Sequence, residues 1–211
     1  MNIKKITCLF FCLAFFSLQL IAQENQPEKP STHKFEKDDH YGIFKFGLSA
    51  PIAFGNNFAN KGLQGKVSTN FSLLANLFEL PIVIGIHYSV LYQSNENITK
   101  LGNYNRSNAI LVGGLAGYHF FERNDFRLLL TAGVGAVSYN NNTPDDIRFS
   151  DNGVSVWLTP EVSYHFNKTL GLYFSPTLRR DFLRTKAPGD LEDFFGSANY
   201  VNLEFGIRVL F

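Results

Sequence analysis

Apolar and polar residues alternate along most of this chain, and the alternation defines eight runs between Tyr41 and Phe211. A period of two places successive side chains on opposite faces of a β-strand. Runs of this kind cross a bilayer as tilted strands. The eight expected strands cover residues 43–50, 67–77, 82–93, 108–120, 126–139, 154–166, 170–182 and 201–211.

The connections between these runs alternate between short and long. Short turns follow the second, fourth and sixth runs. The long loops are 51–66, 94–107, 140–152 and 183–199, and they contain the Asn, Gly, Asp and Pro that turns require. Transmembrane β-barrels have short periplasmic turns and longer extracellular loops. We therefore predict an all-β fold, an eight-stranded antiparallel up-and-down transmembrane β-barrel over residues 41–211.

The polar face of the runs carries the charges that decide which face is inside. Its charged residues include Lys45, Glu161, Arg179, Glu204 and Arg208. A soluble barrel would turn its apolar face inward, but each charge that faced lipid at mid-depth would cost about 2–4 kcal/mol. We expect these five side chains to form an ion-pair network that fills the lumen, with Glu161 near Arg179 and Glu204 near Lys45 or Arg208. A proton or solute relay is the functional alternative.

Three further features of the runs lead to structural expectations. Arg180 is the exception on the apolar face, and it sits at a loop end, where it can snorkel or meet a lipid phosphate. Pro160 and Pro176 lack a ladder donor, so each predicts a bulge or a local break. Aromatic residues at the run ends predict two interfacial girdles. Phe78, Tyr118, Phe120, Tyr164, Phe166 and Phe211 fall at the turn ends, and Tyr88, Tyr92 and Phe182 toward the loop ends.

The N-terminal segment has the features of an export signal. Lys4 and Lys5 precede an apolar run from Ile6 to Ile21, and the small residue Ala22 follows. This order predicts a signal peptide over 1–22, cleaved before Gln23. Both cysteines of the chain lie in the apolar run, so the exported protein has no disulfide.

Residues 23–40 are charged, contain proline and hold one large apolar side chain, Phe35. Such a stretch cannot bury enough apolar surface to offset its ordering entropy. We expect it to form a flexible periplasmic tail. The net charge of the whole chain is +1, which gives no indication of nucleic acid as a partner.

The C-terminal strand carries a resemblance to a known class. Glu204, Gly206, Val209 and Phe211 are spaced as polar, glycine, hydrophobic and terminal aromatic residues. This pattern resembles the terminal assembly signal of bacterial outer-membrane proteins. The chain from 41 to 211 therefore resembles the small eight-stranded barrels of the OmpA/OmpX type. The residues around Ala22 and the Phe-rich strands are also similar to the PorT-like group.

The search for chemistry gives two weak candidates. His87 and Ser89 match the His-x-Ser pair of lipid A deacylases, which belong to barrels of this size, but the alternation places both inward, away from lipid. Asp145, Asp146 and Asp151 could supply oxygen ligands for calcium, although an ordinary acidic turn explains them better. We assign no catalytic residue, no metal site and no cofactor.

The expected function is that of a non-enzymatic outer-membrane barrel that serves envelope structure or surface-loop interactions. Two alternatives stay open: a lipid-modifying enzyme that uses His87 and Ser89, and an accessory component of a secretion machinery, as the PorT-like resemblance implies. The expected partners are outer-membrane lipid and lipopolysaccharide, the outer-membrane assembly machinery at the C-terminal strand, and an unknown protein at the loops or the tail.

Overall fold

The computed structural model describes residues 40–77, 80–123, 125–145, 147–185, 189 and 191–211. Over these residues, eight long strands and one strand of three residues form one antiparallel sheet. The short strand, β2 (Leu63–Gly65), pairs with the end of β4. The long strands are β1 (Gly42–Phe54), β3 (Ser68–Asn76), β4 (Ile82–Asn95), β5 (Arg106–Arg123), β6 (Phe126–Asn142), β7 (Arg148–His165), β8 (Leu170–Leu183) and β9 (Ser197–Leu210).

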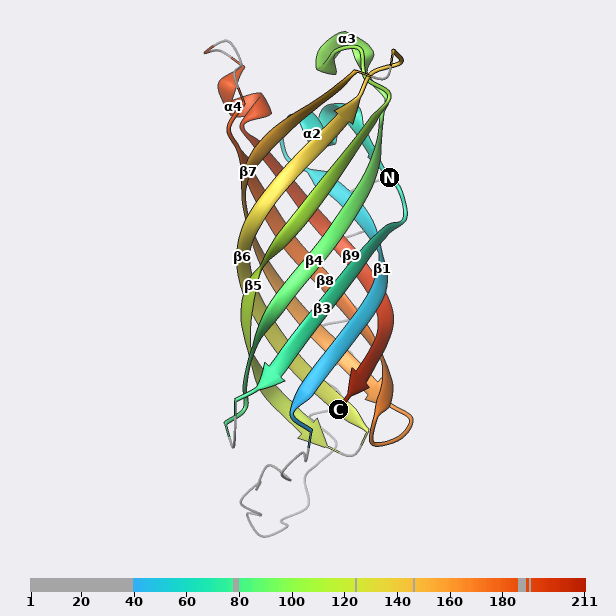
Figure 1. Cartoon of the computed structure of the whole chain (residues 1–211), viewed down its shortest axis with the longest axis vertical. Coiled ribbons are helices and arrows are strands. Elements are labelled where there is room, and N and C mark those ends of the chain that lie inside the picture. Colours follow the sequence, from blue (N-terminus) through green and yellow to red (C-terminus); the bar gives the residue numbers. More distant parts are fainter. Residues whose placement is uncertain (1–39, 78–79, 124, 146, 186–188, 190) are drawn as a thin grey trace, which may run out of the picture. The chain divides into compact units, whose positions relative to one another are not determined.

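The sheet closes on itself as a barrel (Figure 1). The long strands pair in chain order, and β9 pairs with β1, so the predicted eight-stranded up-and-down barrel is confirmed. A line of paired residues that starts at Arg180 and passes once round the barrel returns to β8 at Leu170, ten residues away. This stagger is linked to the strand tilt, and eight strands enclose an interior just wide enough for side chains.

Seven of the eight long strands are longer than the alternation predicts, β3 is shorter, and one predicted loop is wrong over most of its length. β6 continues to Asn142 and β7 begins at Arg148, so the turn between them is 143–147 rather than 140–152. The three asparagines at 140–142 remain paired in the ladder. Asn141 turns inward and is buried, whereas Asn140 and Asn142 are on the outer side, where a hairpin beyond the membrane needs no apolar face. The hydrophobic pattern therefore ends before the strand does.

The other three loops contain short helices that the sequence analysis missed. These are α2 (Phe58–Gly62), α3 (Ile98–Leu101) and α4 (Glu192–Phe195), and all lie at one end of the barrel (Figure 1). Asn57 caps α2, because its side chain accepts a hydrogen bond from the Asn60 amide at 3.0 Å. Phe58 and Ala59 are buried, so α2 packs into the barrel mouth.

Pro160 and Pro176 produce one shared break in the wall and no bulge between their strands. Pairing of β7 with β8 reaches Leu158–Leu178 and resumes in the same register at Val162–Phe174. That register places the two prolines opposite each other. Neither has an amide hydrogen, so the ladder loses both donors at one pair. Thr159 and Thr177, which lie inside the break, join their hydroxyls at 2.9 Å. The bulge of this sheet is elsewhere, between His119 and Phe121 of β5.

The described part of the chain begins and ends at the short-turn end of the barrel (Figure 1). Gly42 and Phe211 exchange both of their main-chain hydrogen bonds, at 2.9 and 3.1 Å. The phenyl ring of Phe211 lies so close to Gly42 that a Cβ there would approach it to 2.5 Å. Glycine at 42 therefore makes room for the ring.

Within the described residues, no helix has the length and apolar character needed to cross a membrane.

Candidate functional site

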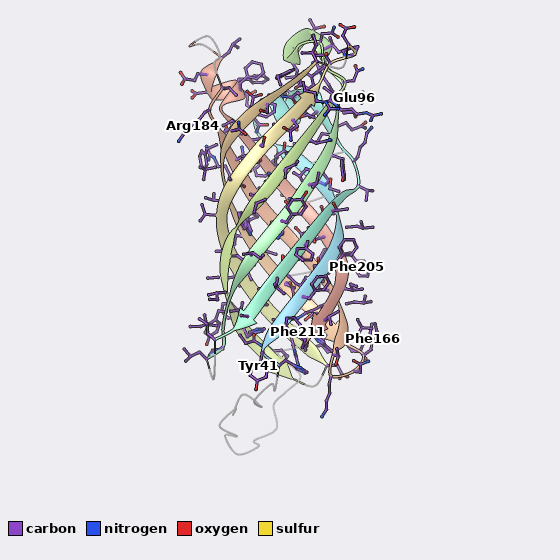
Figure 2. The ribbon with its side chains drawn as sticks, viewed as in Figure 1. Tyr41, Glu96, Phe166, Arg184, Phe205 and Phe211 are labelled. Carbon is purple, nitrogen blue, oxygen red and sulfur yellow. The ribbon has the colours of Figure 1, made fainter. Side chains whose placement is uncertain are left out.

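The two faces of the wall differ in polarity in the direction that the sequence predicts. Outward side chains on the strands are mainly large and apolar, such as Phe205, which is 58% exposed (Figure 2). Most of the inward side chains are buried, and polar and charged groups are frequent among them. An apolar band this extensive needs a cover other than water. This polarity is that of a barrel whose outer wall faces lipid.

Three of the five predicted lumen charges meet at one point. The Glu161 carboxylate lies 2.5 Å from Lys45 Nζ and 2.9 Å from Arg208 Nη1, and all three side chains are almost fully buried. Lys45 and Arg208 are directly opposite each other on β1 and β9. Like charges in that arrangement repel each other. Glu161 reaches both from β7, which is not adjacent to either strand in the sheet.

The remaining two predicted charges have partners that differ from the expected ones. Arg179 does not pair with Glu161: its Nε and Nη2 bond the carboxylate of Asp181 at 2.8 and 2.9 Å. Glu204 accepts hydrogen bonds from the hydroxyls of Thr177 and Ser175, at 2.9 and 3.4 Å. The expected pairs assumed neighbouring strands, whereas Glu161 finds its partners across the lumen.

A second polar cluster, nearer the extracellular end, includes residues that sequence analysis missed. The Tyr139 hydroxyl donates to Asp181 at 2.5 Å and lies 3.0 Å from the Tyr200 hydroxyl, which also accepts from Gln93 at 3.0 Å. The Arg179 guanidinium lies over the Tyr200 ring. Asp181 was detectable, because it stands two residues from Arg179 on the same strand face. The two tyrosines carry no such signal.

The predicted enzyme pair lies inside the barrel. His87 and Ser89 are both buried, and they do not bond each other. The Nδ1 atom of His87 is 2.9 Å from the Ser72 hydroxyl, and Ser89 accepts from Arg179 at 3.4 Å. The His87 ring also packs at 5.3 Å against Trp157. Of the calcium candidates, Asp146 lies outside the described residues, and no group of His, Cys, Asp and Glu in the described part has metal-ligand geometry.

Exposed aromatic rings gather at the short-turn end, where Figure 2 labels Tyr41, Phe166 and Phe211. Tyr164 packs against Phe126 at 5.0 Å and against Phe166 at 5.5 Å. Tyr118 and Phe120 form a further pair at 5.0 Å. Tyr88, Tyr92 and Phe182 are exposed on the outer wall, and Phe78 lies outside the described residues. Such rings suit the two interfaces of a membrane.

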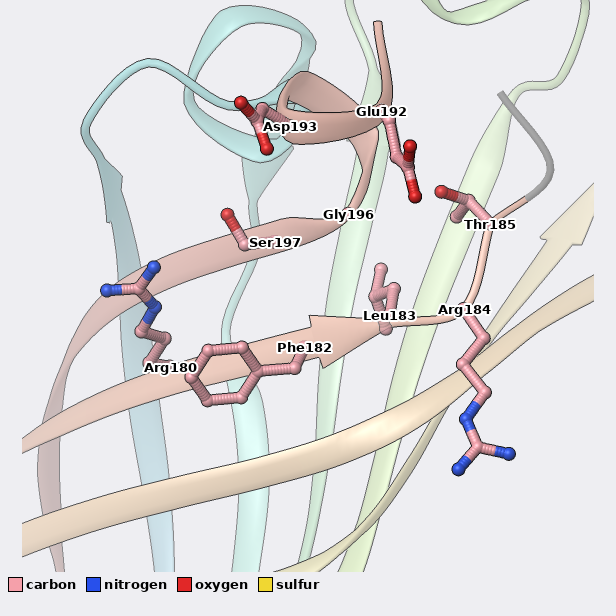
Figure 3. A pocket seen from close by; sticks show the side chains of 9 residues that line it. All are labelled: Arg180, Phe182, Leu183, Arg184, Thr185, Glu192, Asp193, Gly196 and Ser197. Atoms are coloured by element: carbon pink, nitrogen blue, oxygen red, sulfur yellow. The ribbon is translucent and has the colours of Figure 1, made fainter. Parts of the chain in front are cut away.

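A hollow of about 660 Å³ lies at the extracellular ends of β8 and β9, beneath α4 (Figure 3). Arg180 stands on the outer wall there, with its guanidinium 5.0 Å from the centre of the Phe182 ring. Arg184, Glu192 and Asp193 also line the hollow. Arg180, the charged residue predicted on the apolar face, therefore lies beside both the Phe182 ring and the hollow.

The fold and the two faces of the wall define the class of protein: a closed eight-stranded antiparallel β-barrel of the bacterial outer membrane. Comparison with known families agrees. The model of the outer membrane protein beta-barrel domain family matches residues 8–208, and the chain belongs to this family. It is therefore an envelope protein of Gram-negative type, and its short-turn end is the periplasmic one.

Solved structures with a similar fold include bacterial outer-membrane proteins. Neisserial surface protein A, from Neisseria, shares 11% identity with this chain at a TM-score of 0.57, over 81% of this chain and 97% of that one. The major outer membrane protein from Thermus thermophilus shares 12% identity at a TM-score of 0.49, over 80% and 99% of the two chains. The N-terminal barrel of OprF from Pseudomonas aeruginosa shares 13% at 0.46, over 82% and 98%. No curated protein sequence gives a significant match.

Proposed function

We propose that this protein is a non-enzymatic barrel with a side-chain-filled lumen, and that it acts through its extracellular end. One observation carries the proposal: buried charged side chains of the lumen are held by partners inside the barrel. Glu161 holds Lys45 and Arg208, and Asp181 holds Arg179. Trp157 adds a large ring that packs on the glycine backbone of β5 and β6 at Gly113 and Gly133.

The lumen part of the proposal is tested by conductance. The purified full chain, inserted in a planar lipid bilayer, is expected to produce no stepwise current, because buried charges and rings occupy the path. Regular steps of constant size would contradict a filled lumen. Folding is checked in the same sample by the heat-dependent shift in gel migration that intact barrels show.

We also propose that the outer wall takes up a lipid phosphate at the hollow shown in Figure 3. Arg180 supports this, since a cation among apolar side chains is costly unless it meets water or a phosphate. The expected result for Arg180→Gln is less lipopolysaccharide in the purified protein. Arg106→Gln is the matched control, because Arg106 is exposed and begins β5 at the same end. Equal lipid content in both variants would contradict the phosphate site.

The rival enzymatic function has a direct test. A lipid-modifying enzyme needs its nucleophile at the lipid face, whereas His87 and Ser89 are buried. We expect the acylation pattern of lipid A, read by mass spectrometry, to be the same with and without the protein. A changed pattern that disappears in His87→Ala would overturn the non-enzymatic assignment.

The export signal and the tail remain proposals, because residues 1–39 lie outside the described part of the chain. Cleavage after Ala22 is expected to yield a mature protein that begins at Gln23, which N-terminal sequencing reads directly. A secretion role predicts that residues 24–40 capture a periplasmic or inner-membrane protein. A pull-down with the full chain and with a chain that lacks 24–40 separates this role from interactions at the loops.

A further inference from the structure

The barrel mouth contains a pocket of about 260 Å³ that no function above uses. It lies on the inner side of the wall, and the segments that meet there come from all four extracellular connections. The residues that line it are Phe58, Leu101, Tyr104, Tyr139, Asn141, Phe149, Asp151, Leu183, Thr185 and Phe195. The polar cluster of Tyr139, Asp181 and Arg179 lies below, so the pocket is closed toward the lumen.

Five of its ten lining residues are aromatic. Phe58 contacts Tyr139 edge-on at 5.6 Å and stacks on Phe195 at 6.2 Å. Tyr104 meets Phe149 edge-on at 5.7 Å. These five rings come from α2, β6, α4, the segment before β5, and β7. Aromatic faces carry negative potential, so a set of rings of this kind favours an apolar body or a cation.

One charged side chain, Asp151, is present among the lining residues. It lies directly opposite Tyr139 in the β6–β7 ladder and is half-buried. Within the described residues its hydrogen-bond partner is the Asn141 amide, at a long 3.4 Å. Asp181, by contrast, has a bidentate arginine and a tyrosine hydroxyl. The pocket therefore holds a carboxylate that no described cation balances.

Two other lining groups are consistent with a cationic ligand. The hydroxyl of Thr185 is buried and has no hydrogen-bond partner among the described residues. Burial raises the pKa of Tyr104, and the nearby Asp151 carboxylate raises it further, so this phenol stays neutral. The lining thus presents one negative charge, one unused hydroxyl and several rings.

We propose that this mouth pocket binds a small organic cation, an amine that carries one aromatic or branched apolar group. The ammonium group pairs with Asp151, one of its hydrogens reaches Thr185, and the apolar group packs among the rings. A cavity of about 150 Å³ accommodates benzene, so this pocket has room for a ring with a short aminoalkyl arm. The inference deepens the proposed role of the extracellular end and rests on it.

The test measures the binding of phenethylamine to the folded full chain in zwitterionic micelles by calorimetry. Phenylethanol, which has the same shape without the charge, and phenylacetate, which has the opposite charge, are compared on the same protein. We expect binding of the amine alone, and a loss of about tenfold or more in affinity for Asp151→Asn, because a charge-assisted bond is lost. Asp145→Asn is the matched control, since Asp145 lies in the turn of the same hairpin and does not line the pocket.

Three outcomes would overturn the inference: no heat beyond that of micelles alone, equal affinity for the alcohol, or equal affinity of Asp151→Asn and Asp145→Asn. The ligand comparison needs no variant, so it decides the question even where Asp151→Asn fails to fold. If the protein shows no conductance in the bilayer and no binding of phenethylamine, this inference fails and the proposed function stands. Stepwise current in the bilayer would instead contradict the proposed function, because it would show that the lumen is open.

Discussion

At the residue scale, the lumen places three cationic and three acidic side chains in contact with partners rather than with lipid or water. Glu161 is the central member, since it pairs with two cations that the register forces to face each other. A buried ion pair contributes little net stability, because desolvation offsets the attraction. Removing one partner is different, since an uncompensated charge is then left inside. For the same reason, the Asp151 carboxylate in the mouth pocket, which no described cation balances, is expected to bind a cationic ligand.

We predict that Glu161→Gln lowers the free energy of unfolding by about 3–5 kcal/mol, because Lys45 and Arg208 then lose the carboxylate that they share. Urea titration in lipid vesicles measures the change. Trp157 is the only tryptophan of the chain, and it reports unfolding from within the lumen.

Glu204→Gln is the control for this variant, since the hydroxyl groups of Thr177 and Ser175 can still donate to an amide oxygen. We expect a loss of about 1 kcal/mol or less. Adding Lys45→Met to Glu161→Gln should recover part of the larger loss. Equal losses for Glu161→Gln and Glu204→Gln would show that the contact of Glu161 with Lys45 and Arg208 has no special role in stability.

At the element scale, the ladder between β7 and β8 has a single break, because Pro160 and Pro176 stand opposite each other. A proline in a strand always removes its own amide donor from the ladder. When an ordinary residue stands opposite, distortion of the strand at the proline can also leave the amide hydrogen of that residue without an acceptor. Two prolines in the same pair confine the loss to that pair and leave no orphan amide hydrogen. The Thr159–Thr177 hydroxyl contact then closes the inner side of the gap. The wall is continuous here by side chains rather than by backbone.

We predict that Pro176→Val stabilises the barrel by about 1 kcal/mol, because the new amide can donate to the Pro160 carbonyl. Hydrogen exchange read by mass spectrometry should show greater protection of the flanking amides on β7 and β8. Leu178→Val, the next outward position on the same strand, restores no donor and is expected to leave exchange unchanged. Lower protection in Pro176→Val would mean that the break is needed for the fit of the two strands.

At the scale of the whole molecule, closure of the barrel joins the first and last strands. β1 and β9 pair over twelve positions, and Gly42 and Phe211 complete the seam at the periplasmic rim. The predicted assembly signal lies on the last of these strands. Glu204 points inward, while Val209 and Phe211 lie toward the outer wall and the rim, and Gly206 stands opposite Gly47. Recognition of the signal by an assembly machinery remains a prediction.

We predict that Phe211→Ala reduces the amount of folded protein in the outer membrane several-fold in cells, because the terminal aromatic residue is part of the signal. Refolding of the same variant from urea into detergent should be nearly normal, since the ring is more than half exposed. The heat-dependent gel shift measures both. Phe166→Ala, at the same rim, is the control, and an equal loss in that variant would indicate an interfacial role only.

The sequence by itself determined the number of strands, their direction and the side of the wall that faces lipid. These follow from local rules: a period of two, short and long connections in turn, and the cost of a charge in lipid. The same local rules predict that Lys45, Glu161, Arg179, Glu204 and Arg208 point inward, because each lies on the polar face of its run.

Only the tertiary structure decided which of these groups meet. Glu161 joins Lys45 and Arg208 across the lumen, and that distance depends on the stagger of the closed sheet rather than on neighbours in the chain. Closure and register also place Pro160 opposite Pro176. They likewise bring together at the mouth the aromatic rings of α2, of α4 and of three other segments. Local pattern fixes where a side chain points; closure and register fix what it touches.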